Sequence, residues 1–323
     1  MKKRSRKWKL IAVVSCALCS FLPITSIQKA EAAIPRIAGI LSSKSTYWQE
    51  MLQGIEDGCQ EEGLSFFDID ISLQDRDAMT WNVKDAWNLV LMSGADVIIA
   101  DGNLPDAEVV EKAREKGMKI ILVDSDAGKE LRDVYVGTDN RQAGYLAVET
   151  LDQLYGIDGG AVVLQDNEDV AAVSERFHGI CEALKQKWPE VEIKFTETPW
   201  YSERMSNISL EELLMENSDI QAIFGLMESE TTLYAQILKQ KQLEQKVHLI
   251  TFDRSEKMVK LLEEGAVDAI VVQQSYEIGH KSAEIAACLA KGEVPEEDVV
   301  YIDCSVISQK DLPLPEGEKR ADE

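Results

Sequence analysis

The dominant feature of this chain is a repeated alternation of short apolar runs with longer amphipathic segments. Runs such as Asp96–Ala100 and Lys119–Val123 are rich in β-branched residues, as in strands that are buried on both faces of a parallel sheet. Thr46–Glu62 instead places its apolar side chains at helical spacing, and Gly63 follows it. This alternation predicts βαβ units, and therefore an α/β fold with parallel sheets flanked by helices.

The same reasoning assigns elements along the whole chain. The expected strands are Arg36–Leu41, Ser65–Ile71, Asp96–Ala100, Lys119–Val123, Ala161–Gln165, Val191–Thr196, Ala222–Leu226, Val247–Phe252, Ala269–Gln273 and Val299–Cys304. The expected helices are Thr46–Glu62, Ala78–Met92, Asp106–Lys116, Gln142–Tyr155, Ala171–Lys187, Ser206–Glu216, Glu230–Gln240, Ser255–Glu264 and Tyr276–Lys291. So many strands in 323 residues suit two domains better than one sheet.

Residues 1–32 are typical of an export signal. A basic start is followed by the apolar run Leu10–Ile27, and Ala30-Glu31-Ala32 is a small-x-small cleavage pattern. We therefore expect an exported protein, periplasmic or at the cell surface, that begins at Ala33. Two alternatives stay open: a lipid anchor on Cys16, or an uncleaved signal that holds the protein at the membrane.

Charge and cysteine content exclude several classes. The signal holds seven Lys/Arg and one Glu, so its removal changes the formal net charge from −24 to −30. Such a surface repels phosphate backbones, and we expect no nucleic-acid partner. The cysteines outside the signal (Cys59, Cys181, Cys288 and Cys304) are scattered, which favours free thiols and leaves a disulfide as the alternative. The three histidines are far apart, so we expect neither a metal site nor a cofactor.

Ligands of open α/β sheets bind at the carboxyl ends of the strands. The residues just past the expected strands are rich in short acceptors and aromatic rings, and none is a cation. They are Ser42, Ser43, Asp101, Asp124, Thr138, Gln165, Tyr201, Met227, Asp253 and Gln273.

Four segments of the sequence match those of a known protein family in their order and spacing. They are VGTDNRQAG at Val136–Gly144, QAIFG at Gln221–Gly225, ITFD at Ile250–Asp253 and EEGAVDAIVVQQSYEIG at Glu263–Gly279. In these the chain resembles the type I periplasmic solute-binding family, the branch that includes ribose- and galactose-binding proteins. The resemblance covers about Arg36 to Ser308.

The resemblance implies two Rossmann-like lobes joined by three hinge crossovers, with a ligand in the cleft and closure by hinge bending. Lobe one would be 33–138 plus 274–303, and lobe two 139–273 plus 304–323. The proline-punctuated, charged segment 311–323 is expected to be a disordered tail.

The resemblance also implies ligand-binding residues. Tyr47 and Trp48 match an aromatic pair that stacks on a sugar ring, although both also fit the apolar face of their helix. Asp124 and Asp253 match carboxylates that accept from ring hydroxyls, although Asp after a strand is also a common helix N-cap. Gln273 matches a polar contact on the hinge side, and Tyr201 matches an aromatic residue of the second lobe. Thr138 adjoins the first crossover, and Met227 stands at a position that usually holds asparagine.

The sequence departs from the ribose-type pattern at two further positions. Ser125 and Ser174 stand where such relatives place arginines that face the ligand. Losing two guanidinium groups removes many N–H donors from the site. Arg176 and Arg254 are nearby cations at other positions, and a plain ribose or galactose site is in doubt.

These observations favour a binding protein over an enzyme. The chain has no G-x-S-x-G, P-loop, H-E-x-x-H or Rossmann glycine motif. We expect a monomer that captures a small polar ligand, with a sugar as first choice, for the permease of an ABC importer. Two alternatives are a ligand sensor for a membrane receptor or histidine kinase, and an aromatic and acidic cage without arginine that binds an amine.

Overall fold

A computed structural model describes residues 33–42, 45–69, 71, 76–157, 160–165, 170–196 and 203–314. The expected export signal, with Cys16, and Tyr201 lie outside these ranges. Two sheets of six strands organise the described chain.

The first sheet has the order β11-β5-β4-β3-β1-β2, and all its pairs are parallel. In chain order its strands are β1 (Arg36–Ile40), β2 (Ser65–Asp68), β3 (Val97–Asp101), β4 (Lys119–Val123), β5 (Val134–Gly137) and β11 (Val299–Tyr301). The central strands β3 and β4 are buried except for Lys119, which explains their continuous apolar sequences.

The second sheet has the order β12-β10-β9-β8-β6-β7. Its strands are β6 (Ala161–Gln165), β7 (Glu192–Thr196), β8 (Ile220–Gly225), β9 (His248–Phe252), β10 (Ala269–Val272) and β12 (Ser305–Ser308). Only the edge strand β12 runs antiparallel, against β10. In both sheets the parallel strands therefore end at one common edge, where the predicted site residues follow them.

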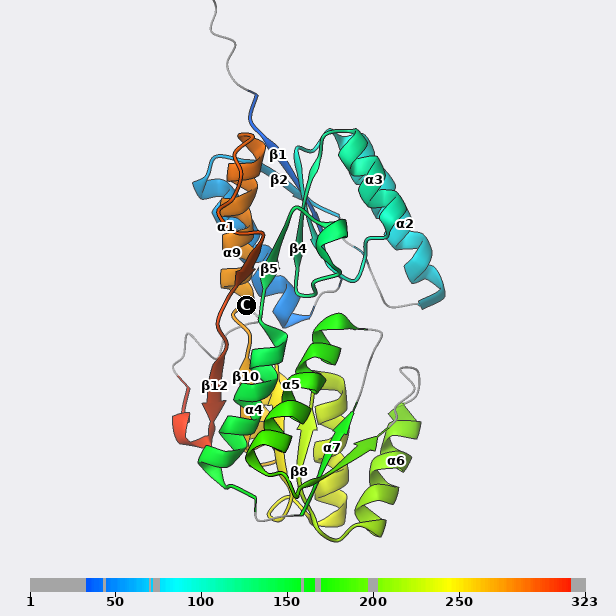
Figure 1. The fold of residues 1–323 in the computed structure, drawn as a ribbon, viewed down its shortest axis with the longest axis vertical. Helices are drawn as coiled ribbons and strands as arrows, with labels where there is room; N and C mark the ends of the chain where they lie inside the picture. The colour runs from blue at the N-terminus through cyan, green and yellow to red at the C-terminus, as the bar shows by residue number, and fades with distance from the viewer. Residues whose placement is uncertain are drawn as a thin grey trace, which may run out of the picture. The chain divides into compact units, whose positions relative to one another are not determined.

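Helices cover both faces of each sheet (Figure 1). They are α1 (Thr46–Glu61), α2 (Arg76–Ser93), α3 (Ala107–Glu115), α4 (Asn140–Leu154), α5 (Ala171–Lys187), α6 (Glu203–Glu216), α7 (Glu228–Lys241), α8 (Glu256–Glu263) and α9 (Ser275–Ala290), with short 3-10 helices at Lys129–Leu131 and Gln309–Asp311. Alternate residues of β3 enter different cores: Val97 and Ile99 face α1 and α9, while Ile98 and Ala100 face α2 and α3.

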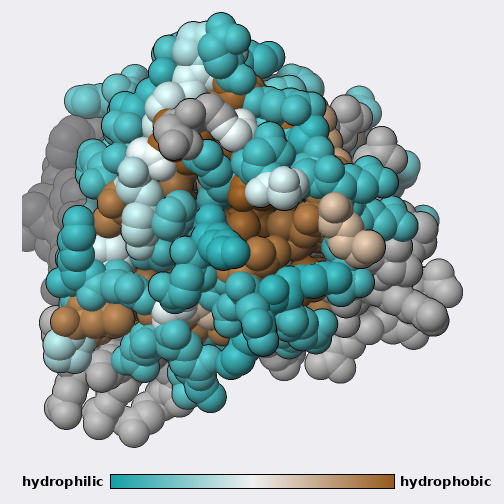
Figure 2. Space-filling model, turned by 90° about the horizontal axis from the view of Figure 1, so that it is seen from below, coloured by the Kyte–Doolittle hydropathy of each residue, from teal (hydrophilic) through white to brown (hydrophobic). Residues whose placement is uncertain are grey.

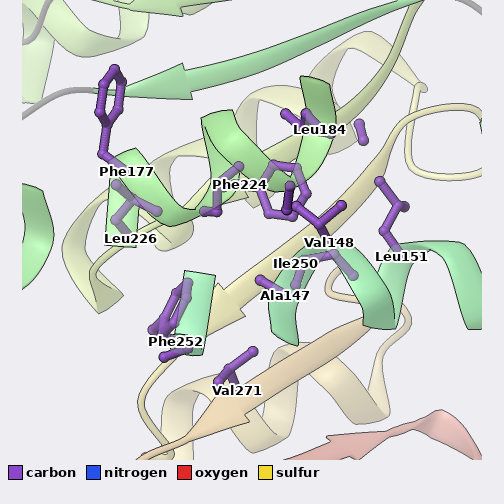
Figure 3. Packing of buried hydrophobic residues seen from close by; sticks show 14 of the residues in the cluster. Ala147, Val148, Leu151, Phe177, Leu184, Phe224, Leu226, Ile250, Phe252 and Val271 are labelled. Carbon is purple, nitrogen blue, oxygen red and sulfur yellow. The ribbon is translucent and has the colours of Figure 1, made fainter. Parts of the chain in front are cut away.

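The second sheet is built in the same way. Figure 3 shows the core on one of its faces, where Val148 of α4 and Leu184 of α5 meet Phe224, Ile250 and other strand residues. The opposite face packs against α7 and α8, together with Leu210 of α6.

The chain passes between the two sheets three times: after β5, after β10 and between β11 and β12. Helix α4 packs on the second sheet, whereas α9 packs on the first beside α1. The molecule thus consists of two Rossmann-like lobes joined by three crossovers, which confirms the predicted fold class.

Three sequence predictions need correction. The strand β5 was not predicted. Val299–Cys304 is not one strand: β11 ends at Tyr301, and the chain crosses to the other sheet before β12 begins at Ser305. The start of the expected disordered tail is ordered, because the Asp311 carboxylate accepts bonds from Ser308 and the Leu314 side chain is 4% exposed.

On the face shown in Figure 2, hydrophilic residues surround a smaller apolar area. Among the described residues, the structure contains no helix with the length and apolar character needed to cross a membrane.

Candidate ligand-binding site

Two aspartates occupy corresponding positions in the two sheets. Asp124 follows β4 and Asp253 follows β9. Their φ angles of 66° and 67° lie in the left-handed region, which aspartate tolerates better than most residues with a side chain. These turns direct the chain out of each strand and leave two carboxylates at the ligand end of the two sheets.

Arg176 of α5 is the cation of this site. Its side chain is almost fully buried and its Nη1 lies 3.8 Å from Oδ2 of Asp253. Nε donates to Oδ1 of Asn140 at 2.8 Å, and Nη1 donates to the carbonyl oxygen of Leu226 at 3.0 Å. The guanidinium also lies over the Phe252 ring, 4.7 Å from its centroid. Two of its five N–H donors are therefore committed to the protein itself.

Burial raises the pKa of Asp124, and Arg176 is the largest opposing influence. The Ser125 hydroxyl donates to Oδ2 of Asp124 at 3.0 Å. Ser174, the other serine that stands where ribose-type relatives place an arginine, lies in the first turn of α5. Arg254 forms an ion pair with Glu50 at 2.9 Å.

Tyr47 and Trp48 stand at the start of α1 with their rings edge to face, 5.2 Å between centroids. Burial, then the Asp124 and Asp253 carboxylates, raise the pKa of Tyr47 well above its ordinary value. Tyr47 is therefore close to the aspartates of both lobes. Both rings are half-buried and also contact the core of the first lobe. They therefore belong to the apolar face of their helix and at the same time lie at the candidate site.

Gln273 follows β10 and is 5% exposed. Its Nε2 donates to Oδ1 of Asp253 at 2.6 Å. Its Oε1 and the Tyr47 hydroxyl are buried, and among the described residues neither has a well-formed hydrogen bond. Buried polar atoms of this kind cost about 1–3 kcal/mol each unless a partner satisfies them.

The other predicted residues differ in placement. Thr138 is buried where the first and third crossovers meet, with the Cys304 thiol 4.0 Å from its Oγ1. Met227 is the half-buried residue before α7 and packs against the core of the second lobe. The structure thus brings Tyr47, Asp124, Asp253 and Gln273 together, and Tyr201 is not described.

Two buried acids near the site were not predicted as site residues. Asp101 ends β3, and burial followed by the Asp124 carboxylate raises its pKa to about 8. Glu230 lies in the first turn of α7, and burial raises its pKa to about 7. The position of Asp101 at a strand end was a usable signal, whereas Glu230 has the same spacing as any residue on the inner face of a helix.

The four described cysteines are free thiols, as expected. Across the described residues, no group of three or more His, Cys, Asp or Glu side chains is placed to hold a metal ion. The site is thus an acidic and aromatic cluster with one internally committed arginine.

Fold and site together define a two-lobed solute-binding protein that places polar and aromatic residues of both lobes around one site. The model of the periplasmic binding protein domain family matches residues 37–293. The chain belongs to this family.

Curated relatives cover nearly the whole chain. The ribose import binding protein RbsB of Haemophilus influenzae is 24% identical over 304 residues, which span 93% of this chain and 99% of the relative. The D-ribose/D-allose-binding protein of Pseudomonas aeruginosa is 22% identical and spans 92% of this chain and 95% of its own.

Solved structures show the same fold. GanP, a glucose-galactose binding protein from Geobacillus stearothermophilus, superposes with a TM-score of 0.77 at 24% identity, covering 87% of this chain and 99% of that protein. A carbohydrate transporter solute-binding protein from Agrobacterium radiobacter, in complex with D-arabinose, gives a TM-score of 0.75 at 21% identity and covers 88% and 97%.

Proposed function

We propose that this protein is an exported solute-binding protein that captures a sugar and delivers it to the membrane permease of an ABC importer. The observation that carries the proposal is the buried Oε1 of Gln273, which has no partner among the described residues, together with the Tyr47 hydroxyl beside the carboxylates of Asp124 and Asp253. A ligand with several hydroxyl groups donates to Gln273 and the carboxylates and also satisfies the Tyr47 hydroxyl.

Tyr47 and Trp48 complete the recognition of a sugar. A pyranose or furanose ring has apolar C–H faces, and an aromatic ring is a matching flat surface. The relatives support this ligand class, since they are binding proteins for ribose, allose, glucose and galactose, and one solved structure holds D-arabinose.

Capture requires the site to open and close. We propose that lobe one (33–138 plus 274–303) and lobe two (139–273 plus 304–323) rotate about the three crossovers. Thr138 lies at this hinge, and the protein acts as a monomer without catalysing a reaction.

The two alternative functions are not favoured. The relatives are described as import or sugar-binding proteins, which supports transport over sensing. The amine cage assumed a site without arginine, but Arg176 is buried 3.8 Å from Asp253 and offsets the negative charge that would attract an ammonium group.

Isothermal titration calorimetry with D-ribose, D-allose, D-arabinose, D-glucose and D-galactose tests the proposal on the protein produced with its own N-terminal segment. We expect saturable binding of at least one sugar. Asp253→Asn keeps the shape but removes the charge, so we expect it to weaken binding by about 1.5–3 kcal/mol, or roughly tenfold to a hundredfold.

The matched control is Asp219→Asn, the same change at an exposed aspartate before β8. It should leave the affinity unchanged. If none of the five sugars binds, or if both variants bind like the unchanged protein, the proposed sugar site is wrong.

A further inference from the structure

Asp101 lies on the ligand side of the first sheet. It is the last residue of β3 and only 2% exposed. Two residues earlier, Ile99 packs in the core that includes Tyr47 and Trp48 of α1. Because alternate strand residues share a face, Asp101 points to the α1 side, where the predicted sugar contacts begin.

A continuous set of hydrogen bonds connects Asp101 to Asp124. The backbone N–H and the Nδ2 of Asn103 each donate to Oδ1 of Asp101 at 2.9 Å. The same Nδ2 lies 2.9 Å from Oγ of Ser125, to which it donates, and that hydroxyl donates to Oδ2 of Asp124 at 3.0 Å. Four side chains and one backbone N–H thus join the ends of two neighbouring strands.

Close packing fixes this connection. A Cβ atom on Gly102 would lie 1.6 Å from the carbonyl oxygen of Ser125. Only glycine allows the two strand ends to approach so closely. Asn103 is therefore held where it can reach both Asp101 and Ser125.

The charges around the pair do not balance. Burial and the Asp124 carboxylate raise the pKa of Asp101, and the two hydrogen bonds from Asn103 lower it. No cation is among these influences. The groups that act on Asp124 come from several elements: Arg176 of α5, Tyr47 of α1, Ser125 after β4 and Asp253 after β9. Tyr135 of β5 donates to the Asp124 carbonyl oxygen at 2.9 Å and has its own pKa raised by burial. Among the described residues, the Arg176 guanidinium thus acts on Asp124 and lies near Asp253, whereas no cation is among the groups that act on Asp101.

We propose that Asp101 and Asp124 share one proton near neutral pH and act together as one hydrogen-bonding unit of the ligand site. Two carboxyl groups that are connected in this way ionise in separate steps, because the first negative charge opposes the second. The shared proton makes one carboxyl group a donor while the other stays an acceptor.

Such a donor is useful at this place. The side-chain donors of Asn103 and Ser125 already bond to acceptors of the protein, and so does one N–H of the Gln273 amide. A carboxylic acid O–H therefore adds a donor among acceptors and matches a ligand hydroxyl or ring oxygen. This part of the inference rests on the proposed sugar-binding function, whereas the shared proton does not.

The proton is tested on the ligand-free protein. With ¹³C placed only at the aspartate side-chain carboxyl carbons, NMR follows each group with pH. We expect one resonance to titrate near pH 8, the value to which burial and Asp124 raise the pKa of Asp101, and to be absent in Asp101→Asn. If every aspartate resonance titrates below about pH 5, as in peptides, the inference is overturned. This result needs only the unchanged protein, so a variant that does not fold leaves the test intact.

Stability supplies a second readout. The pKa of Asp101 is higher in the folded protein than in the unfolded chain, so unfolding releases a proton between these two values. The unfolding equilibrium constant should therefore rise about tenfold per pH unit from about pH 4 to about pH 8 through this group. Asp101→Asn should remove that contribution, and Asp219→Asn should retain it. Identical pH slopes in Asp101→Asn and the unchanged protein would contradict the proposal.

Ligand binding is the third readout, with whichever of the five sugars binds. Its affinity should fall above about pH 8 in the unchanged protein and stay level in Asp101→Asn, since asparagine keeps a donor at every pH. An equal fall in both proteins would exclude the pair from the ligand site. If no sugar binds, the proposed function fails while the NMR titration still decides the shared proton.

Discussion

Arg176 makes a different contact with each element around it. It bonds to Asn140 at the start of α4 and to the Leu226 carbonyl oxygen after β8, and it lies near Asp253 after β9. A guanidinium group meets these partners at once because its donors lie in a fixed plane. The same residue therefore holds three elements of the second lobe at the site.

Replacing Arg176 with lysine tests this role. The ammonium group cannot bond to Asn140 and Leu226 in the same geometry, so we expect a loss of about 3 kcal/mol in the free energy of unfolding. Chemical denaturation measures it. Arg141→Lys is the matched control, because Arg141 is 41% exposed in its pairs with Glu175 and Glu182, and we expect a change below about 1 kcal/mol. Equal effects of the two variants would contradict the role of Arg176.

Glu230 gives a pH-dependent prediction. Burial raises its pKa to about 7, against bonds from the backbone of Leu226 and Met227 and the charge of Arg176. The group binds its proton more tightly in the folded state, so stability falls as pH rises from about 4.5 to about 7. Glu230→Gln keeps an oxygen for the Leu226 N–H and should remove this fall, which is on the order of 3 kcal/mol.

Denaturant unfolding at pH 5 and pH 8 measures the effect. Glu230→Gln should gain stability over the unchanged protein at pH 8 and match it more closely at pH 5. Glu228→Gln, in the same helical turn, should follow the unchanged protein at both pH values. A Glu230→Gln variant that is equally destabilised at both would show that the carboxylate is ionised in the fold.

Sequence reasoning at this scale located acceptors better than donors. Asp124, Asp253 and Gln273 follow strands, and the strand pattern can be read locally. Arg176 is one of two nearby cations that the sequence offered, and nothing local separates it from Arg254. Only the fold decides that Arg176 is buried among its partners while Arg254 reaches Glu50.

At the scale of elements, each lobe contains a pair of helices that cross through glycines. A Cβ on Gly54 of α1 would lie 2.1 Å from the Tyr276 carbonyl oxygen, and one on Gly279 of α9 would lie 2.0 Å from that of Met51. Gly144 and Gly179 give α4 and α5 a similar approach. These close approaches bring α9, which follows the second crossover, against α1, and α4, which follows the first crossover, against α5.

Gly54→Ala should disrupt this crossing. The added methyl meets backbone, which cannot rotate away, so the helices must separate. We expect a loss of about 1–3 kcal/mol in the free energy of unfolding, measured by chemical denaturation. Alanine at the exposed Glu56 of the same helix should change it by less than about 0.5 kcal/mol. Unchanged stability of Gly54→Ala would show that the crossing is loose.

Element positions were mostly predictable, and the exceptions share a cause. The expected strand Val299–Cys304 contains both β11 and a crossover, because apolar character continues through the point where the chain changes sheets. The short strand β5 (Val134–Gly137) overlaps the start of the VGTDNRQAG segment, and the polar crossover that follows it hides its pattern. Periodicity records burial, and both sheets bury their strands alike.

At the scale of the whole molecule, Glu50 connects the two lobes. It belongs to α1, which covers the first sheet, and its Oε1 accepts from Arg254 after β9 of the second sheet at 2.9 Å. Its Oε2 accepts from the Ser275 hydroxyl at 2.6 Å, at the start of α9. Arg254 directly follows the site residue Asp253, so this ion pair ties the ligand end of lobe two to lobe one.

Arg254→Met tests this contact. Each partner is 24% exposed, so we expect a loss of only about 1 kcal/mol in stability. If the pair forms only when the lobes are closed, its loss should raise the dissociation rate of the bound sugar about fivefold. Stopped-flow fluorescence measures that rate. Lys281→Met, the control, breaks an ion pair within α9 alone and should leave the dissociation rate unchanged. If Arg254→Met also left that rate unchanged, the contact would have no part in closure.

The sequence by itself determined the α/β class, the two-lobed arrangement and the strand ends where ligands bind, because burial on a strand or helix leaves a local periodic pattern. The tertiary structure decided which groups at those ends remain available to a ligand. It committed Arg176 to Asn140 and Leu226, placed Tyr47 beside Asp124, and joined Asp101 to Asp124. It also left Oε1 of Gln273 without a partner among the described residues. Hydrogen bonds and charges act through space between residues far apart in the chain, and no pattern along the sequence records them.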